Sequence, residues 1–355
     1  MEALLSSVPS ASAAAYTLKQ RTVAAFLGPA AGLWHAFMGP HERKGDPKLL
    51  EVIDRLHTEA LAEDYANADA GLYPMSLIFP LPGWHDVKFL PEALLDMPSI
   101  FWRKRRGDFH VDAPSQAAPS DGAIPLPDYY LRTFHWQTGG WMSAHSARVY
   151  ELQVEFLFFG TMDVMRRRGL AALVRALGGD RHRMRVRILD VACGTGRFLE
   201  QARAALPEAT LEGVDLSDFY VERARARLGP DARASVRVAN AESLGGQSGV
   251  YDAVTCGFLF HELPKDARRR VASELFRVLE PGGVLVAQDS MQRTDPNGRD
   301  LEVFLDWFPR AYHEPYYKGY VADDLGTLLE EAGFRVEARD HVLFSKVIVA
   351  KKPLD

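Results

Sequence analysis

The feature that most constrains this chain is a change of pattern near its middle. From about Arg185 onward, short apolar runs alternate with segments of helical periodicity. Such alternation is typical of a parallel β-sheet whose strands are joined by crossover helices. Before about Gly178 the chain lacks this rhythm and is richer in Pro, Trp and Tyr. With 355 residues it can form two cores, so we predict two domains, 1–178 and 179–355.

Seven strands and four helices are expected in the second domain. The strands are placed at 186–191, 210–214, 235–239, 251–256, 284–288, 334–338 and 343–350. The helices are placed at 197–205, 218–228, 265–279 and 322–332. The last two strands follow each other closely, so we expect them to pair antiparallel. The fold class predicted is α/β: a Rossmann-like, doubly wound, mostly parallel seven-stranded sheet with a mainly helical N-terminal extension.

The N-terminal half gives weaker signals. Apolar residues recur at helical spacing over 47–68, and 143–174 is predicted to form one long helix or two. Five prolines interrupt 72–101, which is therefore expected to be broken, and 107–128 is predicted to be a loop. The opening SSVPSASAAA is interpreted as a frayed terminus rather than a transit segment.

Composition excludes several classes of protein. The formal net charge of −5 gives no overall attraction to polyphosphate, so no nucleic-acid partner is expected. The two cysteines, Cys193 and Cys256, are too few for a disulfide scaffold and favour a cytoplasmic location. No apolar run reaches the roughly 18 residues of a membrane helix, so no integral membrane segment is predicted. The basic runs 103–106, 166–168 and 268–270 are expected to be solvated helix faces, and a homodimer is left open.

The stretch from Ile188 to Gly196 is the first candidate ligand site. A buried strand passes through Asp190 into a turn with Ala192, Gly194 and Gly196, and a helix follows. Small residues allow the backbone to approach a ligand closely, and the N–H groups at a helix start favour electron-rich groups. A glycine turn alone is weak evidence, because dinucleotide-binding folds have one too.

A carboxylate sharpens the interpretation. Asp215 ends the second expected strand, 21 residues after Gly194, where an acid can accept hydrogen bonds from a ribose diol. The spacing fits NAD and S-adenosylmethionine equally. A dinucleotide-binding motif also requires a third small residue, three positions after Gly196. That position holds the bulky Leu199. This departure disfavours NAD.

Two further segments complete a resemblance to class I S-adenosylmethionine-dependent methyltransferases. The segment 238–244 resembles their adenine-contacting loop, and 279–285 resembles the turn before their fifth strand. The resemblance covers roughly 185–350 and implies S-adenosylmethionine as cofactor. The cofactor-binding residues that it implies are Asp190, Ala192, Gly194, Gly196, Asp215, Leu216, Asn240, Ala241, Glu242 and Gly257. The chain departs from the pattern at Ala192, where the family usually has glycine, and in the adenine loop, where Asn240 and Glu242 share the role of a displaced acid.

The segment after the fourth strand bears on the acceptor. It lacks the Asn/Asp/Ser-Pro-Pro-aromatic motif of enzymes that methylate amino groups in DNA. Residues 258–263 instead resemble those of small-molecule methyltransferases, including the quinone and lipid C-methylating group. We therefore expect O- or C-methylation of a small, aromatic or lipid-like acceptor. The pair His261-Glu262 lacks the second histidine of a zinc protease motif, because position 265 is lysine, so no metal site is predicted.

Candidate catalytic residues come from aromatic-rich segments. A base is needed only for a protonated acceptor, and His261, His313 and Tyr317 are the candidates. The cluster between Tyr129 and Trp141 is expected to cover the carboxyl edge of the sheet as a substrate lid, which makes 1–178 a substrate or lid domain. The alternatives are a non-catalytic S-adenosylmethionine-binding assembly partner, an NAD-dependent oxidoreductase and a protein methyltransferase.

Overall fold

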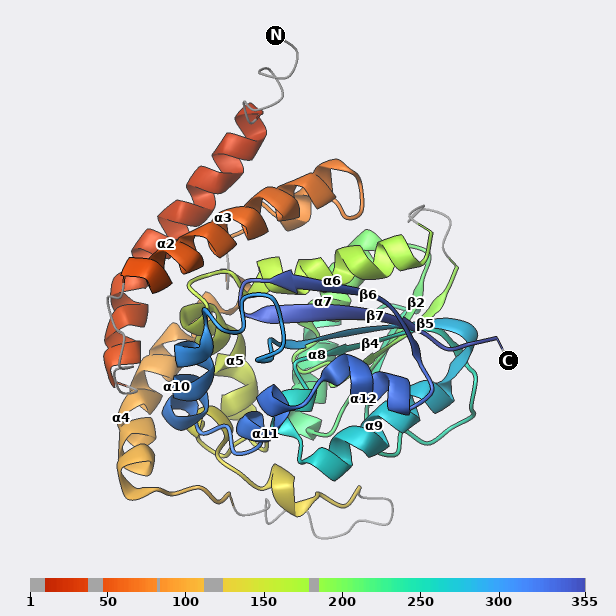
Figure 1. The fold of residues 1–355 in the computed structure, drawn as a ribbon. Coiled ribbons are helices and arrows are strands. Elements are labelled where there is room, and N and C mark those ends of the chain that lie inside the picture. The colour runs from red at the N-terminus through yellow and green to blue at the C-terminus, as the bar shows by residue number, and fades with distance from the viewer. Residues whose placement is uncertain (1–9, 38–46, 82–83, 112–123, 179–184, 355) are drawn as a thin grey trace.

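A seven-stranded sheet lies at the centre of the protein (Figure 1). The computed structural model describes residues 10–37, 47–81, 84–111, 124–178 and 185–354. The strands are β1 (Arg187–Val191), β2 (Thr210–Asp215), β3 (Ala234–Val238), β4 (Tyr251–Gly257), β5 (Leu279–Ser290), β6 (Arg335–Val342) and β7 (Ser345–Lys351). Their order is β3-β2-β1-β4-β5-β7-β6, and only β7 runs antiparallel to its neighbours. The predicted fold class is confirmed, including the antiparallel last pair.

Helices cover both faces of this sheet. In the C-terminal half they are α7 (Arg197–Ala205), α8 (Asp218–Leu228), α9 (Lys265–Val278), α10 (Glu302–Tyr312), α11 (Tyr317–Ala322) and α12 (Leu325–Glu331). In Figure 1, α9 and α12 lie on one side of the strands and α6 and α7 on the other. The helix predicted over 322–332 begins later, because the Asp324 side chain accepts a hydrogen bond from the N–H of Thr327 and caps α12.

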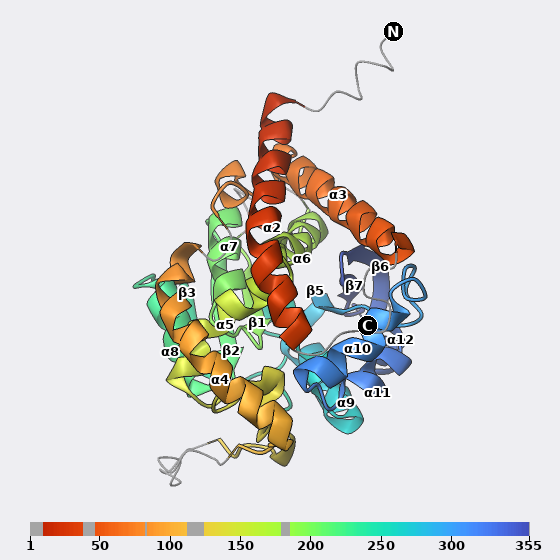
Figure 2. The ribbon, with the colours of Figure 1, turned by 90° about the vertical axis from the view of Figure 1, so that its left-hand side faces the viewer.

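The described residues of the N-terminal half include five α-helices: α2 (Ala11–Phe37), α3 (Pro47–Asp69), α4 (Leu90–Arg106), α5 (Ala144–Leu157) and α6 (Met162–Ala176). Figure 2 shows α2 lying across α3 and α6 toward the viewer. The segment predicted as one helix or two forms two, because Phe159 and Gly160 adopt φ values of 52° and 79° and break the helix. Short 3₁₀ turns are η1 (Met75–Leu77), η2 (Trp84–Phe89), η3 (Asp128–Tyr130), η4 (Phe134–Trp136) and η5 (Phe260–Glu262).

Two expectations about the N-terminal half are wrong. The proline-rich stretch contains α4, because Pro91 occupies the first turn of the helix, where no N–H partner is needed. Pro98 lies inside α4, and the carbonyl four residues earlier belongs to Leu94, an exposed residue that water can reach. The opening segment is helical from Ala11 onward and not frayed there; its first residues lie outside the described ones.

The basic runs are also not solvated faces throughout. Arg166, Arg167 and Arg168 are all buried, as is Arg268. The guanidinium of Arg167, for example, donates to both carboxylate oxygens of Asp64 on α3, at 2.8 and 2.7 Å. These arginines lie where helices pack on other elements, so each charge is neutralised by a buried or half-buried acid.

One buried apolar cluster joins the two halves of the chain, with members from Tyr16 on α2 to Ala350 on β7. Helix α6 packs on β5 and β7. Gly169 permits this approach, since a Cβ there would lie 2.6 Å from Oε1 of Gln288, whose amide donates to the carbonyl of Met165. The expected domain boundary at 178 lies between α6 and the first strand of the sheet, although α6 packs on that sheet. The division into two domains remains a prediction.

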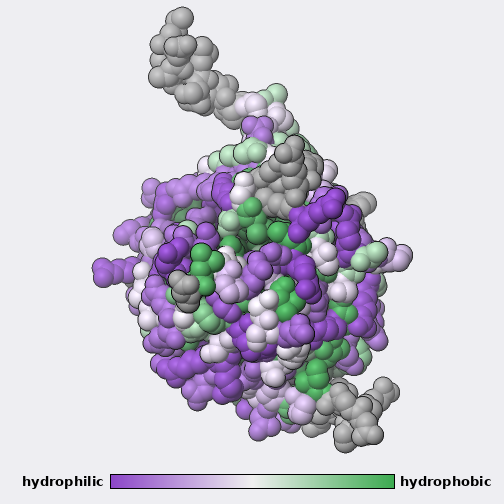
Figure 3. Space-filling model, turned by 90° about the vertical axis from the view of Figure 1, so that its right-hand side faces the viewer, coloured by the Kyte–Doolittle hydropathy of each residue, from purple (hydrophilic) through white to green (hydrophobic). Residues whose placement is uncertain are grey.

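The surface is polar on the face shown in Figure 3, where hydrophobic side chains form only small separate groups. Within the described ranges, no helix combines the length and the apolar character that crossing a bilayer requires. Cys193 and Cys256 are both buried and not disulfide-bonded, and burial raises the pKa of each thiol.

Candidate active site

The strand order reverses direction between β1 and β4, and a cavity opens at their carboxyl ends. In an open α/β sheet this switch point is where ligands bind. Ala192 and Gly194 line the cavity from the turn after β1, and Gly257 lines it from the end of β4. Ala192 and Gly194 adopt φ values of 58° and 54°, and the position of a Cβ on Gly194 would be open space. The turn therefore presents bare backbone to a ligand, as the sequence predicts.

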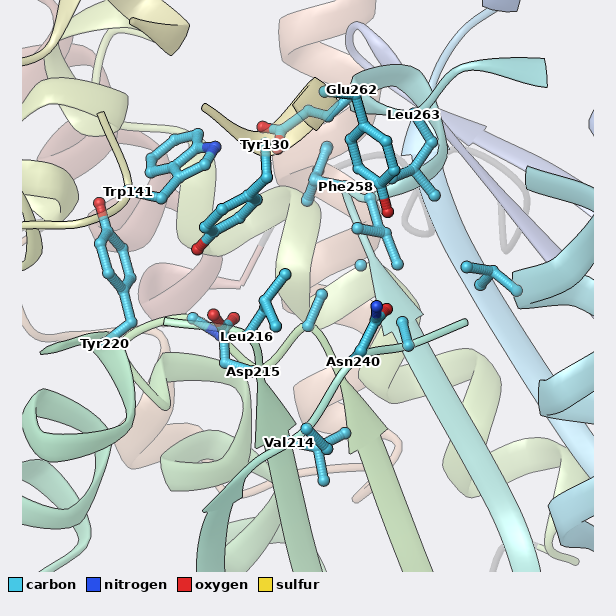
Figure 4. A pocket seen from close by; sticks show the side chains of 18 of the residues that line it. Tyr130, Trp141, Val214, Asp215, Leu216, Tyr220, Asn240, Phe258, Glu262 and Leu263 are labelled. Carbon is cyan, nitrogen blue, oxygen red and sulfur yellow. The ribbon is translucent and has the colours of Figure 1, made fainter. Parts of the chain in front are cut away.

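Asp215 lies beside this turn at the end of β2 (Figure 4). One carboxylate oxygen accepts a hydrogen bond from the N–H of Gly194 and the other accepts one from the N–H of Ser217, both at 2.9 Å. Burial raises the pKa of this carboxyl group, although the backbone hydrogen bonds oppose the shift. Because each oxygen has a second lone pair, the fixed carboxylate can still accept from a diol.

The N-terminal half covers the cavity. In Figure 4, Tyr130, Trp141 and Glu262 lie across the opening from Asp215, Leu216 and Asn240. Including the open solvent at its mouth, the cavity measures about 780 Å³. Trp141 also packs edge-on against Tyr220 from α8. The predicted position of the aromatic segment 129–141, over the carboxyl edge of the sheet, is thus found in the structure.

Two of the expected cofactor-binding residues, Gly196 and Glu242, do not line the cavity at the strand ends. A Cβ on Gly196 would lie 2.9 Å from Cβ of Ala224, so the glycine allows α7 and α8 to pack closely. The Glu242 carboxylate turns outward, where it accepts from the hydroxyl of Tyr129 and from Nε of Arg270, each at 2.5 Å. Leu216, Asn240 and Ala241 do line the cavity. Glu242 therefore anchors the covering segment at the rim.

A smaller cavity continues beneath the β1 turn. It is lined by Asp190, Gly194 and Thr195 and by three charged residues that were not predicted as site residues, Glu151, Arg166 and Arg197. Nη1 of Arg166 donates to the Glu151 carboxylate at 2.8 Å. Burial raises the pKa of Asp190 to about 7, although a hydrogen bond from Thr255 opposes this shift. The helical pattern of 143–174 placed Glu151 and Arg166 on helices but not beside the glycine turn.

Comparison with known proteins agrees with the expected function of this crevice. Residues 188–283, from β1 to the glycine turn inside β5, match a family model described as a methyltransferase domain. Over these residues the match confirms the predicted resemblance to S-adenosylmethionine-dependent methyltransferases, and with it the cofactor predicted from the glycine turn and Asp215.

Curated relatives of this methyltransferase domain include enzymes of quinone methylation. The chain is 33% identical over 112 residues to a demethylmenaquinone methyltransferase of Lactococcus lactis, covering 31% of this chain and 44% of that protein. It is 29% identical over 175 residues to one from Symbiobacterium thermophilum, covering 41% and 67%. It is 37% identical over 150 residues to the ubiquinone/menaquinone biosynthesis C-methyltransferase of Syntrophotalea carbinolica, covering 41% and 59%. The chain thus spans about half to two thirds of these relatives.

The residues of the crevice fit this cofactor. The open backbone at Gly194 and the backbone-held carboxylate of Asp215 suit a ribose, and Asn240 and Ala241 lie where an adenine can reach them. Trp141 carries a buried Nε1 that has no hydrogen-bond partner within the described chain. Such a donor fits a polar ligand in the cavity.

A second, mainly apolar cavity adjoins the crevice of the methyltransferase domain. Both cavities are lined by Tyr150, Phe258 and Glu262. The apolar lining residues of the second cavity are Val154, Leu157, Phe158, Met162, Met165, Phe304, Phe308 and Phe344. Its polar side chains come from His135, His261, Glu262, Ser290 and Tyr317. The connection after β5 supplies part of this wall from α10 and α11.

The structure brings two of the three candidate catalytic residues into this second cavity. Nδ1 of His261 lies 2.7 Å from Oδ1 of the buried Asp289. Burial lowers the pKa of His261, but the Asp289 charge and hydrogen bond outweigh it and raise the pKa to about 9. The Tyr317 hydroxyl is hydrogen-bonded to Oγ of Ser290 at 2.6 Å, and burial raises its pKa.

His313 lies elsewhere. Its ring stacks on Phe109 with a centroid distance of 4.5 Å and packs on Trp136 at 4.9 Å. It lines neither the cofactor cavity nor the second cavity. Burial lowers its pKa to about 4, so the imidazole is neutral at physiological pH. His313 and Tyr317 are close in sequence, but His313 caps the end of α10 and Tyr317 begins α11, so their side chains lie in different surroundings.

Proposed function

We propose that this protein transfers a methyl group from S-adenosylmethionine to oxygen or carbon of a small acceptor that is aromatic or lipid-like. The observation that carries the proposal is the pair of adjoining cavities that share Tyr150, Phe258 and Glu262. One carries the carboxylate of Asp215 and the amide of Asn240 and lies at the strand ends of the methyltransferase domain. The other is mainly apolar with a few converging polar groups, the usual character of a small-molecule site.

The cofactor is assigned to the first cavity. Asp215 would accept hydrogen bonds from the ribose, and Asn240 and Ala241 would contact the adenine. Glu151, Arg166 and Asp190 would surround the amino-acid end in the smaller cavity below the glycine turn. When bound, the cofactor supplies an electrophilic methyl group on a sulfonium.

The side chains of the second cavity would orient the acceptor. Asp289 fixes the His261 imidazole through Nδ1, so that Nε2 is the ring atom left for an acceptor oxygen. Tyr317 can donate a hydrogen bond from its buried hydroxyl. The aromatic walls exclude water and align the acceptor, which are the main requirements of an in-line displacement. We therefore retain His261 and Tyr317 in this role and leave out His313.

Quinone-methylating relatives support an aromatic acceptor, and the phenylalanine-rich wall suits the same class. The test is incubation of the full chain with methyl-labelled S-adenosylmethionine and a metabolite extract, followed by mass spectrometry. We expect a labelled small molecule with the wild type and none with Asp215→Ala.

Each alternative gives a different result in that experiment. Label in the protein fraction would indicate a protein methyltransferase. A chain that binds S-adenosylhomocysteine but labels nothing would be a non-catalytic binding partner. Binding of NAD in preference to S-adenosylhomocysteine would indicate an oxidoreductase. Any of these outcomes would overturn the proposed function.

A further inference from the structure

Three side chains from separate segments converge beside the second cavity. They are His135 in η4, Glu262 in η5 and Glu314 directly after the end of α10. One ring nitrogen of the histidine and one oxygen of each carboxylate all lie within 4.8 Å of one another. Such a cluster is compact enough for the three atoms to share one ligand.

Their hydrogen bonding is incomplete. Glu314 is 3% exposed, and neither of its carboxylate oxygens has a hydrogen-bond donor in the described parts of the chain. Nε2 of His135 also lacks a hydrogen bond, although it lies only 2.7 Å from Oε1 of Glu314. Buried polar atoms without partners are rare in native proteins. Buried acceptor atoms gathered this closely without donors are what the ligands of a metal ion present.

The charges are also only partly compensated. Among the described residues, no lysine or arginine forms an ion pair with Glu262 or Glu314. The neighbouring His261 places Nε2 3.9 Å from Oε1 of Glu262, but its Nδ1 already pairs with Asp289 at 2.7 Å. Burying several carboxylates around one counter-charge is costly. A divalent cation with a neutral His135 imidazole would cancel the charges of Glu262 and Glu314.

We propose that His135, Glu262 and Glu314 bind a divalent transition-metal ion. One imidazole nitrogen and two carboxylate oxygens form a donor set suited to ions such as Mn²⁺ or Zn²⁺. Three protein ligands leave coordination positions open for water or another oxygen. The segment that carries His135 is held in place, because Nε1 of Trp136 donates to the carbonyl of Ala311 at 2.9 Å.

The ion would face the second cavity, since His135 and Glu262 line it. There it could polarise an oxygen of the acceptor as a Lewis acid. This consequence rests on the proposed function, whereas binding of the ion does not. A test made without cofactor or acceptor therefore separates the two proposals.

The experiment is a titration of the chelator-treated full chain with Mn²⁺, in which electron paramagnetic resonance measures the free ion. We expect one tightly bound ion per chain in the wild type. Removing one ligand in Glu314→Gln or His135→Gln should weaken binding by about tenfold or more. Glu222→Gln changes an exposed carboxylate on α8 and should bind as the wild type does. The circular dichroism spectrum and thermal unfolding of each variant report whether it is folded.

If Glu314→Gln does not fold, the half-buried His135→Gln variant and the wild-type titration carry the test. Failure of the wild type to bind Mn²⁺ or, in a parallel titration followed by mass spectrometry, Zn²⁺ would overturn the proposal. Equal binding by the wild type and a folded ligand variant would overturn it as well, because the ion would then lie elsewhere.

Discussion

At the scale of single residues, Asp215 is the side chain on which cofactor binding depends most. Its two oxygens are oriented by the N–H groups of Gly194 and Ser217. Asp215→Asn replaces one acceptor oxygen with a donor, and hydrogen bonds to charged groups contribute about 1.5–3 kcal/mol each. We therefore expect S-adenosylhomocysteine to bind roughly tenfold to a hundredfold more weakly in calorimetry. Glu222→Gln serves as the control, and unchanged affinity in Asp215→Asn would contradict the assignment.

Asp190 predicts a pH dependence of stability. Burial raises its folded-state pKa to about 7, above the ordinary value, so the folded state holds a proton that the unfolded state releases. The stabilisation from this proton is fully present below about pH 4. As the pH rises to about 7, the free energy of unfolding falls by roughly 4 kcal/mol. Asp190→Asn should lose that slope in urea unfolding followed across pH. A slope as steep as that of the wild type would show that another group is responsible.

Residues close together in sequence were the ones that could be predicted. The glycine turn and Asp215 lie 21 residues apart on adjacent strands, so spacing alone brings them together. Glu242 was predicted as a cofactor contact, but its partner Tyr129 lies 113 residues away and nothing local indicates that pairing. The proposed metal ligands His135, Glu262 and Glu314 also lie far apart in sequence, so no local motif indicates them.

At the scale of elements, the hydrogen bond from Tyr129 to Glu242, a carboxylate that also accepts from Arg270, holds η3 against the rim of the cofactor cavity. Tyr129→Phe removes the hydroxyl while the ring can keep its place. We expect cofactor dissociation to become several-fold faster in stopped-flow measurements, with little change in the melting temperature. Tyr65→Phe, on α3 and away from the cavity, is the matched control. An unchanged dissociation rate in Tyr129→Phe would show that this contact does not retain the cofactor.

The elements of the C-terminal half were predicted within a few residues because strand and helix periodicities are strong there. The helices α7 and α8 match their predicted bounds. The errors concern elements whose stability depends on packing. Helix α4 continues past Pro98, and the connection after β5 folds into α10 and α11, where Phe308 and Tyr312 of α10 pack against His135 from the N-terminal half.

At the scale of the whole molecule, the buried pair of Asp64 and Arg167 joins α3 to α6, and α6 covers the sheet. Removing one partner of such a pair costs about 3–5 kcal/mol. We expect Asp64→Asn to lower the free energy of unfolding by that amount, with tryptophan fluorescence and circular dichroism changing in one transition. Asp69→Asn, exposed on the same helix, should have little effect. Two separate transitions would instead support independent domains at 1–178 and 179–355.

The most direct test of the whole account is a crystal structure of the full chain with S-adenosylhomocysteine. We predict the ribose diol on the carboxylate of Asp215 and the adenine beside Asn240. The sulfur should face the opening between Tyr150, Phe258 and Glu262, from which the second cavity begins. A ligand whose sulfur faces away from that opening, or a strand-end crevice that does not take up the ligand, would contradict the account.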